Sequence, residues 1–215
     1  MAAPPVRVDP LGDRAVILTF GDRIDPAVHA RVTALARQLR RHPPAGVDEI
    51  VPSYTTLAAW FDPALRRPAE LAAELLEREA AGAATDPEPG REWVIPVHYD
   101  GPDLEWVAAR TGLDPDEVVR RHTARPYTVY LLGFVPGFAY LGELDPALVL
   151  PRRSTPRQRV PAGSVAIAGA QTAVYPLATP GGWHLIGRTT LRLFDPEREP
   201  PALLAAGDTV RFESR

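Results

Sequence analysis

Arginine side chains gather in one stretch of this chain that contains no acidic residue. No Asp or Glu occurs between Pro146 and Phe194, although the whole chain has a formal net charge of -3. Guanidinium groups bind carboxylates and phosphates through paired hydrogen bonds, so this stretch predicts an anion-binding site. The alternative is that each arginine only solvates a turn, because exposure is the rule for this residue type. The arginines concerned are Arg152, Arg153, Arg157, Arg159, Arg188 and Arg192.

The sequence around Arg157 and Arg159 indicates how such a site is built. The two residues are two positions apart, and on an extended chain they face the same side. The PAGS turn that follows them supplies free backbone N–H groups, and the amide of Gln171 and the hydroxyl of Thr172 can both donate and accept hydrogen bonds. Together with Arg188, these residues are our candidates for binding an anion and a neutral polar group.

Two further motifs combine aromatic residues with glycine turns. GFVPGFAYL places Phe134, Phe138 and Tyr140 around a Pro-Gly turn, and TPGGWHLIGR places Trp183 and His184 after a double glycine. Such rings can wall a ligand pocket, or they can fill the core of a barrel. Tyr140 and His184 are the candidates for proton transfer, although a lone histidine is more often a structural residue.

Several kinds of chemistry are excluded by what the chain lacks. It contains no Cys and no Lys, since all 24 basic residues are Arg, which excludes disulfides, thiolate catalysis and a lysine Schiff base. No metal-binding pattern such as HExxH is present, so we expect no metal site. No complete catalytic set is visible, so a carboxylate base must come from elsewhere in the fold or from a partner. The other histidines are predicted to be structural: His29, His42, His98 and His122.

The composition is that of a globular protein. The 215 residues are 45% hydrophobic and 24% charged, enough for one large domain or two small ones. The sequence pI of about 6.0 argues against general nucleic-acid binding. No apolar run approaches the roughly 20 residues of a membrane span, and the N-terminus lacks a hydrophobic signal core. We therefore expect a cytoplasmic protein without a membrane or nucleic-acid partner.

The chain has two halves that differ in their hydrophobic pattern. In the first half, to about residue 84, predicted strands at 15–20, 47–51 and 55–61 alternate with two amphipathic helices. The first helix starts at Asp25-Pro26, a capping residue followed by a proline, and the second covers 68–81. This alternation fits a compact α+β sandwich.

The second half is predicted to be mainly β. Residues 81–90, AGAATDPEPG, have the composition of a linker. After a strand at 93–98 and two short helices, short β-rich runs alternate with Gly/Pro turns, which favours a barrel or a sandwich. These runs are Tyr127–Leu132, Ser164–Ala168, Thr189–Phe194 and Thr209–Phe212.

Long segments of the chain resemble one bacterial family. GFVPGFAYLGELDP, TPRQRVPAGSVAIAGAQTAVYP and TPGGWHLIGRT carry the resemblance, and GDRAVILTFGDRIDPAVHARVTAL and EIVPSYTTLAAWFDP extend it to nearly the whole chain. Members are called the B subunit of 5-oxoprolinase, allophanate hydrolase subunit 1 or KipI-type sensor-kinase inhibitor, and contain carboxyltransferase subdomains C and D. The resemblance implies an α+β ferredoxin-like domain over residues 1–84 and a mainly-β cyclophilin-like barrel over residues 85–215.

The resemblance also implies a function. The chain is expected to be the B subunit of an ATP-dependent 5-oxoprolinase, which opens 5-oxoproline to glutamate with ATP as the co-substrate of the complex. Its partners would be a second barrel subunit, of the 5-oxoprolinase C-subunit or allophanate hydrolase subunit 2 type, together with an A subunit of the LamB/YcsF type. The alternatives are a KipI-like inhibitor that binds a sensor histidine kinase and an accessory subunit of urea or allophanate metabolism.

Within such a complex the candidate residues have definite expected roles. A lactam is a poor electrophile, and phosphorylation of its oxygen by ATP would activate it. We expect Arg157, Arg159 and Arg188 to hold the substrate carboxylate or a phosphate. We expect Phe138, Tyr140 and Trp183 to form walls around the lactam ring. Gln171 and Thr172 are expected to bind the lactam amide, and His184 and Tyr140 are the expected catalytic residues.

Overall fold

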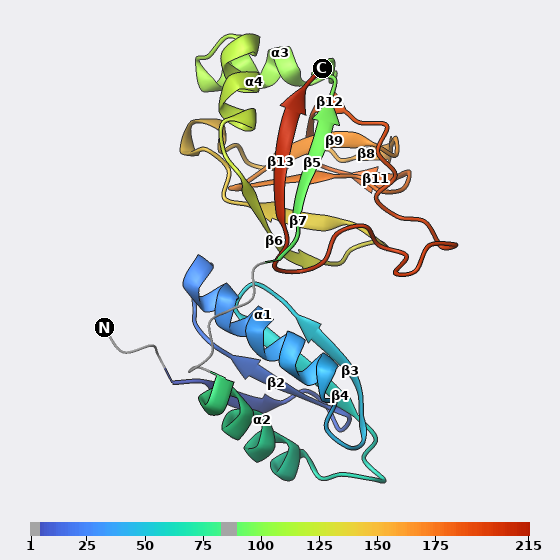
Figure 1. Cartoon of the computed structure of the whole chain (residues 1–215). Helices are drawn as coiled ribbons and strands as arrows, with labels where there is room; N and C mark the ends of the chain where they lie inside the picture. Colours follow the sequence, from blue (N-terminus) through green and yellow to red (C-terminus); the bar gives the residue numbers. More distant parts are fainter. Residues whose placement is uncertain (1–4, 83–89) are drawn as a thin grey trace. The chain divides into compact units, whose positions relative to one another are not determined.

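The computed structural model describes residues 5–82 and 90–215 of the chain. The chain divides into two compact units, residues 1–89 and 90–215 (Figure 1). Each unit contains a hydrophobic core made of its own residues. The linker expected at 81–90 falls largely on residues 83–89, outside the described residues, so the linker and the expected domain bounds stay predictions.

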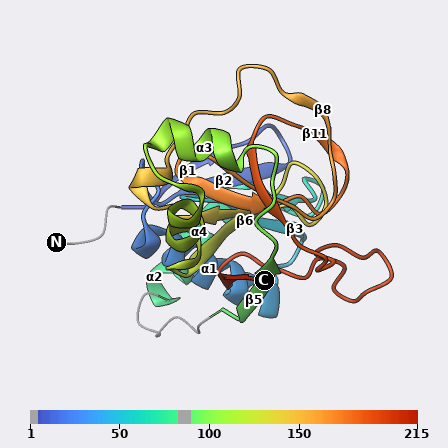
Figure 2. The same ribbon diagram turned by 90° about the horizontal axis from the view of Figure 1, so that it is seen from above.

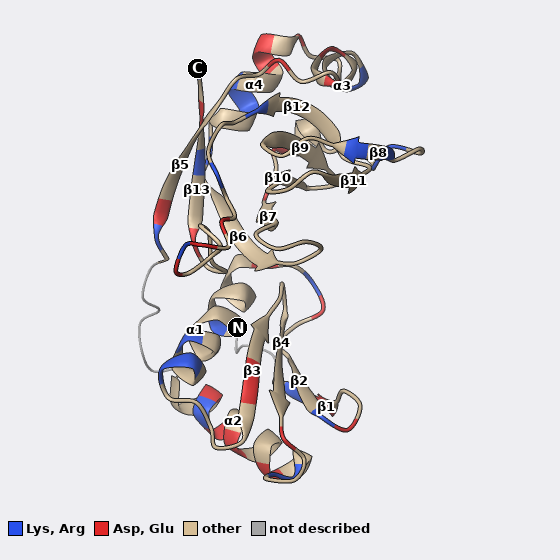
Figure 3. Ribbon diagram, turned by 90° about the vertical axis from the view of Figure 1, so that its right-hand side faces the viewer, with Lys and Arg blue, Asp and Glu red and all other residues tan. Residues whose placement is uncertain are grey.

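The first unit is a four-stranded antiparallel sheet with two helices on one face. The strand order is β1-β2-β4-β3. Both helices share one core with the strands, and Figure 3 shows them on the same side of the sheet. The elements are β1 (Arg7–Pro10), β2 (Ala15–Thr19), α1 (Pro26–Arg41), β3 (Val47–Pro52), β4 (Thr56–Phe61) and α2 (Pro68–Gly82).

Helix α1 begins where the sequence predicts it to begin. The Asp25 carboxylate accepts hydrogen bonds from two backbone N–H groups of the first turn, at 2.8 and 3.2 Å, and Pro26 occupies the first helical position. Val32, Leu35 and Leu39 are at most 3% exposed. The apolar stripe of the helix is therefore buried against the sheet.

The second unit is mostly β, and seven of its strands form a nearly closed, barrel-like sheet. The order is β12-β9-β10-β7-β6-β13-β5, and all pairs are antiparallel except the parallel pair of β13 and β5. Helices α3 and α4 lie together at one end of this sheet (Figure 1), and the two-stranded sheet of β8 and β11 lies outside it (Figures 2 and 3). The barrel alternative of the sequence prediction is the correct one for this half.

The elements of the second unit include, as strands, three of the four predicted β-rich runs: 127–132, 164–168 and 209–212. The elements are β5 (Glu92–Val97), α3 (Leu104–Thr111), α4 (Pro115–Thr123), β6 (Tyr127–Leu132), β7 (Ala139–Gly142), a short 3-10 helix η1 (Pro146–Leu148), β8 (Arg157–Val160), β9 (Ser164–Ala168), β10 (Gln171–Val174), β11 (Thr179–Gly181), β12 (His184–Arg188) and β13 (Thr209–Ser214). Both helices contribute to the interior core, through Val107 of α3 and Val118 of α4. They therefore pack on the barrel of their own unit.

The barrel closes between β12 and residues 98–103, which we call the closing segment. His98 and Arg188 exchange two main-chain hydrogen bonds, at 2.9 and 2.8 Å. Further along, the Asp103 N–H donates to the carbonyl of Leu185 at 2.9 Å. The closing segment therefore runs antiparallel along β12 and joins one edge of the sheet to the other.

The structure differs from the sequence prediction at residues 189–194, where a strand was expected. The strand instead covers His184–Arg188 and ends where its pairing with the closing segment ends. Residues 189–193 have no strand structure, yet Thr189 and Leu193 are buried. The β-rich composition of this run thus reflects packing against the barrel and not pairing in a sheet.

Closure requires close approach of two backbones, and this leads to a testable expectation. A Cβ atom on Gly187 would lie 2.7 Å from the carbonyl oxygen of His98 and 2.8 Å from the Val97 side chain. We expect Gly187→Ala to lower the free energy of unfolding by about 1–3 kcal/mol, because the backbone must shift to relieve this overlap. Urea unfolding of the full chain measures the change. The control is Gly182→Ala, whose Cβ would be 3.7 Å from its nearest neighbour; equal losses in both variants would contradict the argument.

Candidate functional site

Strand β12 separates the candidate residues onto two faces of the barrel sheet. His184 is paired with Ile167 on β9, and Ile167 is paired with Thr172 on β10. Paired residues on neighbouring strands point to the same face, and Ile167 belongs to the interior core. His184 and Thr172 therefore point into the barrel. Trp183, the residue before His184, belongs to a second cluster on the outer face.

An aromatic cluster covers this outer face, and we define it as Phe138, Tyr140, Tyr175 and Trp183. The ring centroid of Phe138 lies 4.9 Å from Tyr140, 5.3 Å from Tyr175 and 5.8 Å from Trp183, with the rings at steep angles. Tyr140 is partly exposed, whereas the other three are buried. Gln171 on β10 faces the same side, because strand residues alternate. The structure thus brings together the three rings predicted as pocket walls, with Gln171 on their side.

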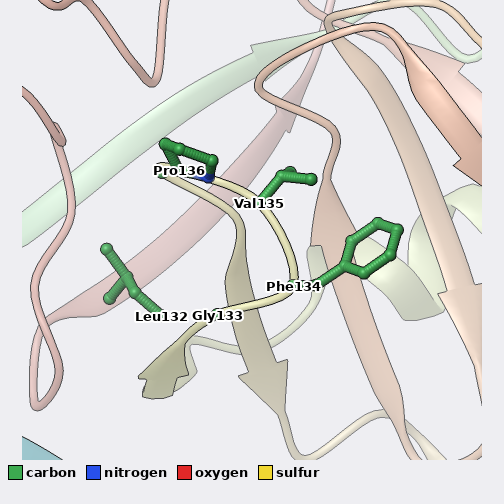
Figure 4. Close-up of a pocket in the computed structure, with 6 residues that line it drawn as sticks. Leu132, Gly133, Phe134, Val135 and Pro136 are labelled. Carbon is green, nitrogen blue, oxygen red and sulfur yellow. The ribbon is translucent and has the colours of Figure 1, made fainter.

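An open pocket of about 300 Å³ lies in the loop between β6 and β7 (Figure 4). Phe134 in this loop is 61% exposed and has a φ of 71°, which is uncommon for a residue with a side chain. Its ring meets Phe138 edge-on at 5.5 Å, and Figure 4 shows it pointing away from Leu132 and Pro136. The loop therefore holds an exposed ring at the rim of the aromatic cluster. The pocket is lined by Leu132, Gly133, Phe134, Val135, Pro136 and Gly137.

Two of the predicted anion-binding arginines have carboxylate partners from the closing segment. Arg157 Nη2 donates to Asp103 Oδ1 at 2.7 Å, and Arg153 Nη1 donates to the same oxygen at 3.1 Å. Arg188 pairs with Asp100 at 2.7 Å, and both of these side chains are about half exposed or more. The acids that are missing from the basic stretch are therefore supplied by tertiary structure.

Arg159 differs from Arg157 and Arg188. It is exposed, and among residues 5–82 and 90–215 it has no ion pair. It lies two positions after Arg157 on β8, in a stretch whose pairing with β11 contains a register shift. Figure 3 shows β8 as a basic strand on the outside of the barrel. The three arginines do not form one set of contacts: two are engaged by carboxylates, and Arg159 is available to an external anion.

Asp103 is the functional candidate that the sequence analysis missed. Its side chain is 6% exposed, and its second oxygen, Oδ2, accepts the backbone N–H of Leu185 at 2.7 Å. Burial by itself raises the pKa of Asp103, but the hydrogen bonds from Arg157 and from the Leu185 N–H outweigh it, so the pKa lies below its ordinary value. The arginines that it binds are 50 and 54 residues away in the sequence. The only sequence signal was the lack of acids near those arginines.

His184 is a buried imidazole with one hydrogen-bond partner on the main chain. It is 2% exposed, and its ring is stacked on Trp106 of α3 with centroids 4.5 Å apart and planes 13° apart. Nε2 lies 2.9 Å from the carbonyl oxygen of Pro151, which can only accept, so Nε2 donates this hydrogen bond. Nδ1 is buried and has no hydrogen-bond partner in the described part of the chain. His184 is therefore covered by Trp106 and lies on the opposite face of the sheet from Tyr140.

Thr172 lies in a hydrogen-bonded chain inside the barrel. Its hydroxyl donates to the carbonyl of Ala166 at 3.0 Å and accepts from His122 Nε2 at 2.8 Å. His122 Nδ1 in turn accepts from the Tyr99 hydroxyl at 2.7 Å. Burial lowers the pKa of His122 to about 3, so the ring is neutral and satisfied at both nitrogens. This arrangement gives the Thr172 hydroxyl no direct access to a ligand, contrary to its expected contact with a lactam amide.

The outer face therefore offers two kinds of recognition. The exposed guanidinium of Arg159 suits an oxyanion, and the partly exposed ring of Tyr140, backed by the buried rings of the aromatic cluster, suits the flat face of a small ring. Among the residues that the structure describes, no group of three or more His, Cys, Asp or Glu is placed to hold a metal ion. None of the described helices combines the length and the apolar character needed to cross a membrane.

The sequence matches a family model described as carboxyltransferase domain, subdomain C and D, over residues 6–204. The chain belongs to this family. It is 43% identical to the B subunit of 5-oxoprolinase from Bacillus subtilis, over 96% of this chain and 91% of that protein. It is 46% identical to the B subunit of 5-oxoprolinase from Escherichia coli, over 94% and 93% of the two chains. The family resemblance carried by the sequence motifs is therefore confirmed.

Solved structures give the fold of subdomains C and D in longer proteins. The crystal structure of TTHA0988 superposes with a TM-score of 0.85 at 44% identity, over 94% of this chain and 40% of that one. This chain thus spans less than half of TTHA0988. The Kluyveromyces lactis urea carboxylase superposes with a TM-score of 0.76 at 20% identity, over 98% of this chain and 22% of that enzyme. The second similarity supports the fold alone.

The buried His122 predicts how the stability of this subdomain C and D chain depends on pH. Below its ordinary pKa of 6.5 the unfolded chain binds a proton at this histidine, whereas the folded chain does not until about pH 3. The free energy of unfolding therefore decreases as the pH falls, by about 2 kcal/mol between pH 7 and pH 5. Thermal unfolding at several pH values measures this loss. His122→Gln should be less stable at pH 7 but should lose less stability on acidification, and an unchanged slope would contradict the assignment.

Proposed function

We propose that this chain is the B subunit of an ATP-dependent 5-oxoprolinase complex, active only with its partner subunits. The observation that carries the proposal is identity above 40% with two proteins of that name, over more than nine tenths of each chain. No feature of the described residues favours histidine-kinase inhibition or a role in urea or allophanate metabolism. We place the complex in the cytoplasm, with two partners: a second barrel subunit plus a subunit of the LamB/YcsF type.

The proposed domain architecture is a ferredoxin-like domain over residues 1–84 followed by a cyclophilin-like barrel over residues 85–215. The order β2-α1-β3-β4-α2, with both helices on one face, supports the first assignment. In this domain the edge position next to β2 is filled by the N-terminal strand β1. The nearly closed sheet of the second unit supports the second assignment.

The proposed reaction divides into activation and hydrolysis. ATP transfers its terminal phosphoryl group to the lactam oxygen of 5-oxoproline, and ADP leaves. Water then attacks the activated carbon and the ring C–N bond breaks, which leaves an acyl phosphate. A second water molecule hydrolyses this acyl phosphate, which yields glutamate and inorganic phosphate. ATP is a co-substrate of the complex, and this chain's part is to bind and orient an anionic, ring-shaped substrate.

The residues of the outer face support this role. We assign the carboxylate or a phosphate to Arg159, with Arg157 beside it on β8, and the ring to Phe138, Tyr140 and Trp183. Gln171 is assigned to the lactam amide and Tyr140 to proton transfer, because both face the aromatic side. His184, Thr172 and Arg188 keep only indirect roles in this proposal: the first two point into the barrel, and Arg188 is held by Asp100.

The first test is reconstitution of the complex. The purified chain alone should release no measurable glutamate from 5-oxoproline and ATP, because the described site contains no complete acid–base set. Activity should appear when its two partners, the second barrel subunit plus the LamB/YcsF-type subunit, join it in one mixture. Each pair of subunits is the control. Full turnover by this chain alone, or no turnover by the three-subunit mixture, would be evidence against the proposal.

The second test concerns Arg159. Replacement of Arg159 by Ala in the assembled complex should weaken substrate binding by about 1.5–3 kcal/mol, the contribution of a hydrogen bond to a charged group. Arg159→Lys should retain only part of the substrate affinity that Arg159→Ala loses, because the planar guanidinium group is lost. The KM for 5-oxoproline and for ATP measures the effect. Arg192→Ala, which removes an exposed arginine paired with Asp195, is the matched control; the same KM in all variants would leave Arg159 as a solvated surface residue.

A further inference from the structure

Asp103 connects four separate parts of the second unit. It stands directly before α3 as the helix-capping residue, yet its side chain makes no cap hydrogen bond. Asp25 and Asp114, in the same position before α1 and α4, do make such bonds. Both Asp103 oxygens are used elsewhere, by Arg153, by Arg157 and by the backbone of β12. The carboxylate of Asp103 therefore binds two arginines instead of capping the first turn of α3.

The two ion pairs of Asp103 with Arg153 and Arg157, which we call the clamp, leave unused hydrogen-bond donors on both arginines. Arg153 Nε and Arg157 Nη1 are buried and have no hydrogen-bond partner among the described residues. One carboxylate faces two guanidinium groups, and Arg159, two residues after Arg157 on β8, adds a third without an ion pair in the described ranges. The local charge is therefore positive, and the donors exceed the acceptors. Such a surplus favours an oxyanion, because buried donors are normally satisfied.

The clamp also fixes the position of β12. The backbone of Leu185 donates to Asp103 Oδ2 at 2.7 Å and accepts from the Asp103 N–H at 2.9 Å. The Arg153 N–H donates to the carbonyl of Gly182 at 2.8 Å, so the segment that carries Arg153 is attached to the residues just before β12. The arginines and the strand beside the aromatic cluster are therefore held in one arrangement by one carboxylate.

We propose that Asp103 is the positioning residue of an oxyanion-binding site formed by Arg153, Arg157 and Arg159. Asp103 does not touch the ligand. It neutralises one of three neighbouring guanidinium groups, orients Arg153 and Arg157, and leaves Arg159 available to a carboxylate or a phosphate oxygen. The inference deepens the proposed function, on which it rests, by assigning the anionic group of the substrate or nucleotide to this site.

The experiment compares Asp103→Asn with Asp208→Asn in the full chain. Asp208 is a matched control, because it is 5% exposed and its carboxylate accepts from Arg91 N–H, Trp93 Nε1 and Ala205 N–H, none of which belongs to the proposed site. Calorimetric titration uses two probes, 5-oxoproline and inorganic phosphate, and thermal unfolding is recorded for each variant. Both variants should unfold at lower temperature than the natural chain, whereas only Asp103→Asn should weaken binding, by about tenfold or more.

A second variant keeps the test decisive if Asp103→Asn folds poorly. Arg159→Gln leaves the clamp intact, so it should weaken binding by about tenfold with an unchanged unfolding temperature. In the double variant the two losses should not multiply, because Asp103 acts through the arrangement of the arginines. If the variants weaken the binding of 5-oxoproline alone, the site binds a carboxylate. If they weaken the binding of inorganic phosphate alone, the site binds a phosphate.

Three results would overturn the inference: no binding of either probe by the natural chain, equal weakening in Asp103→Asn and Asp208→Asn, or fully multiplicative losses in the double variant. The proposed function fails separately, through reconstitution. Oxyanion binding that depends on Asp103, in a complex without 5-oxoprolinase activity, would keep the site and reject the function. Activity in a complex whose Asp103→Asn variant binds both probes normally would keep the function and reject the site.

Discussion

The second unit depends on the antiparallel contact between β12 and the closing segment. A sheet that ended at β12 would leave a row of backbone N–H and C=O groups unpaired, and such edges must be covered or paired. The closing segment pairs with them and seals the barrel. It also carries Asp100 and Asp103, so the same contact delivers both carboxylates to the arginines of the basic stretch. The contact that closes the barrel therefore also places the two carboxylates beside the arginines.

The alternation of residues along β12 decides which chemistry faces a ligand. His184 points inward, where buried polar groups need partners, and it donates to a backbone carbonyl. The chain of hydrogen bonds through His122 meets the same requirement across the barrel. Trp183 points outward, joins the aromatic cluster and lies under the guanidinium of Arg152 at 5.9 Å. Residues adjacent in one motif therefore belong to different environments.

Local structure could be predicted from the sequence because its causes are local. Asp25-Pro26 and Asp114-Pro115 begin α1 and α4 as expected, since a capping carboxylate and a proline act within one turn. The division into an α+β half and a β-rich half follows from hydrophobic periodicity. The strand expected at 189–194 was wrong because buried β-branched and apolar residues also occur in irregular segments that pack on a barrel.

The sequence by itself determined the helix starts, the β-rich character of the second half, the acid-free basic stretch and the family. Only the tertiary structure decided that Asp103 neutralises Arg153 and Arg157, that Arg159 is left without an ion pair among the described residues, and that His184 and Tyr140 lie on opposite faces of the sheet. The physical reason is that ion pairs and sheet faces depend on distances in space. Asp103 and Arg157 are 54 residues apart in the chain, and they meet only because the barrel closes.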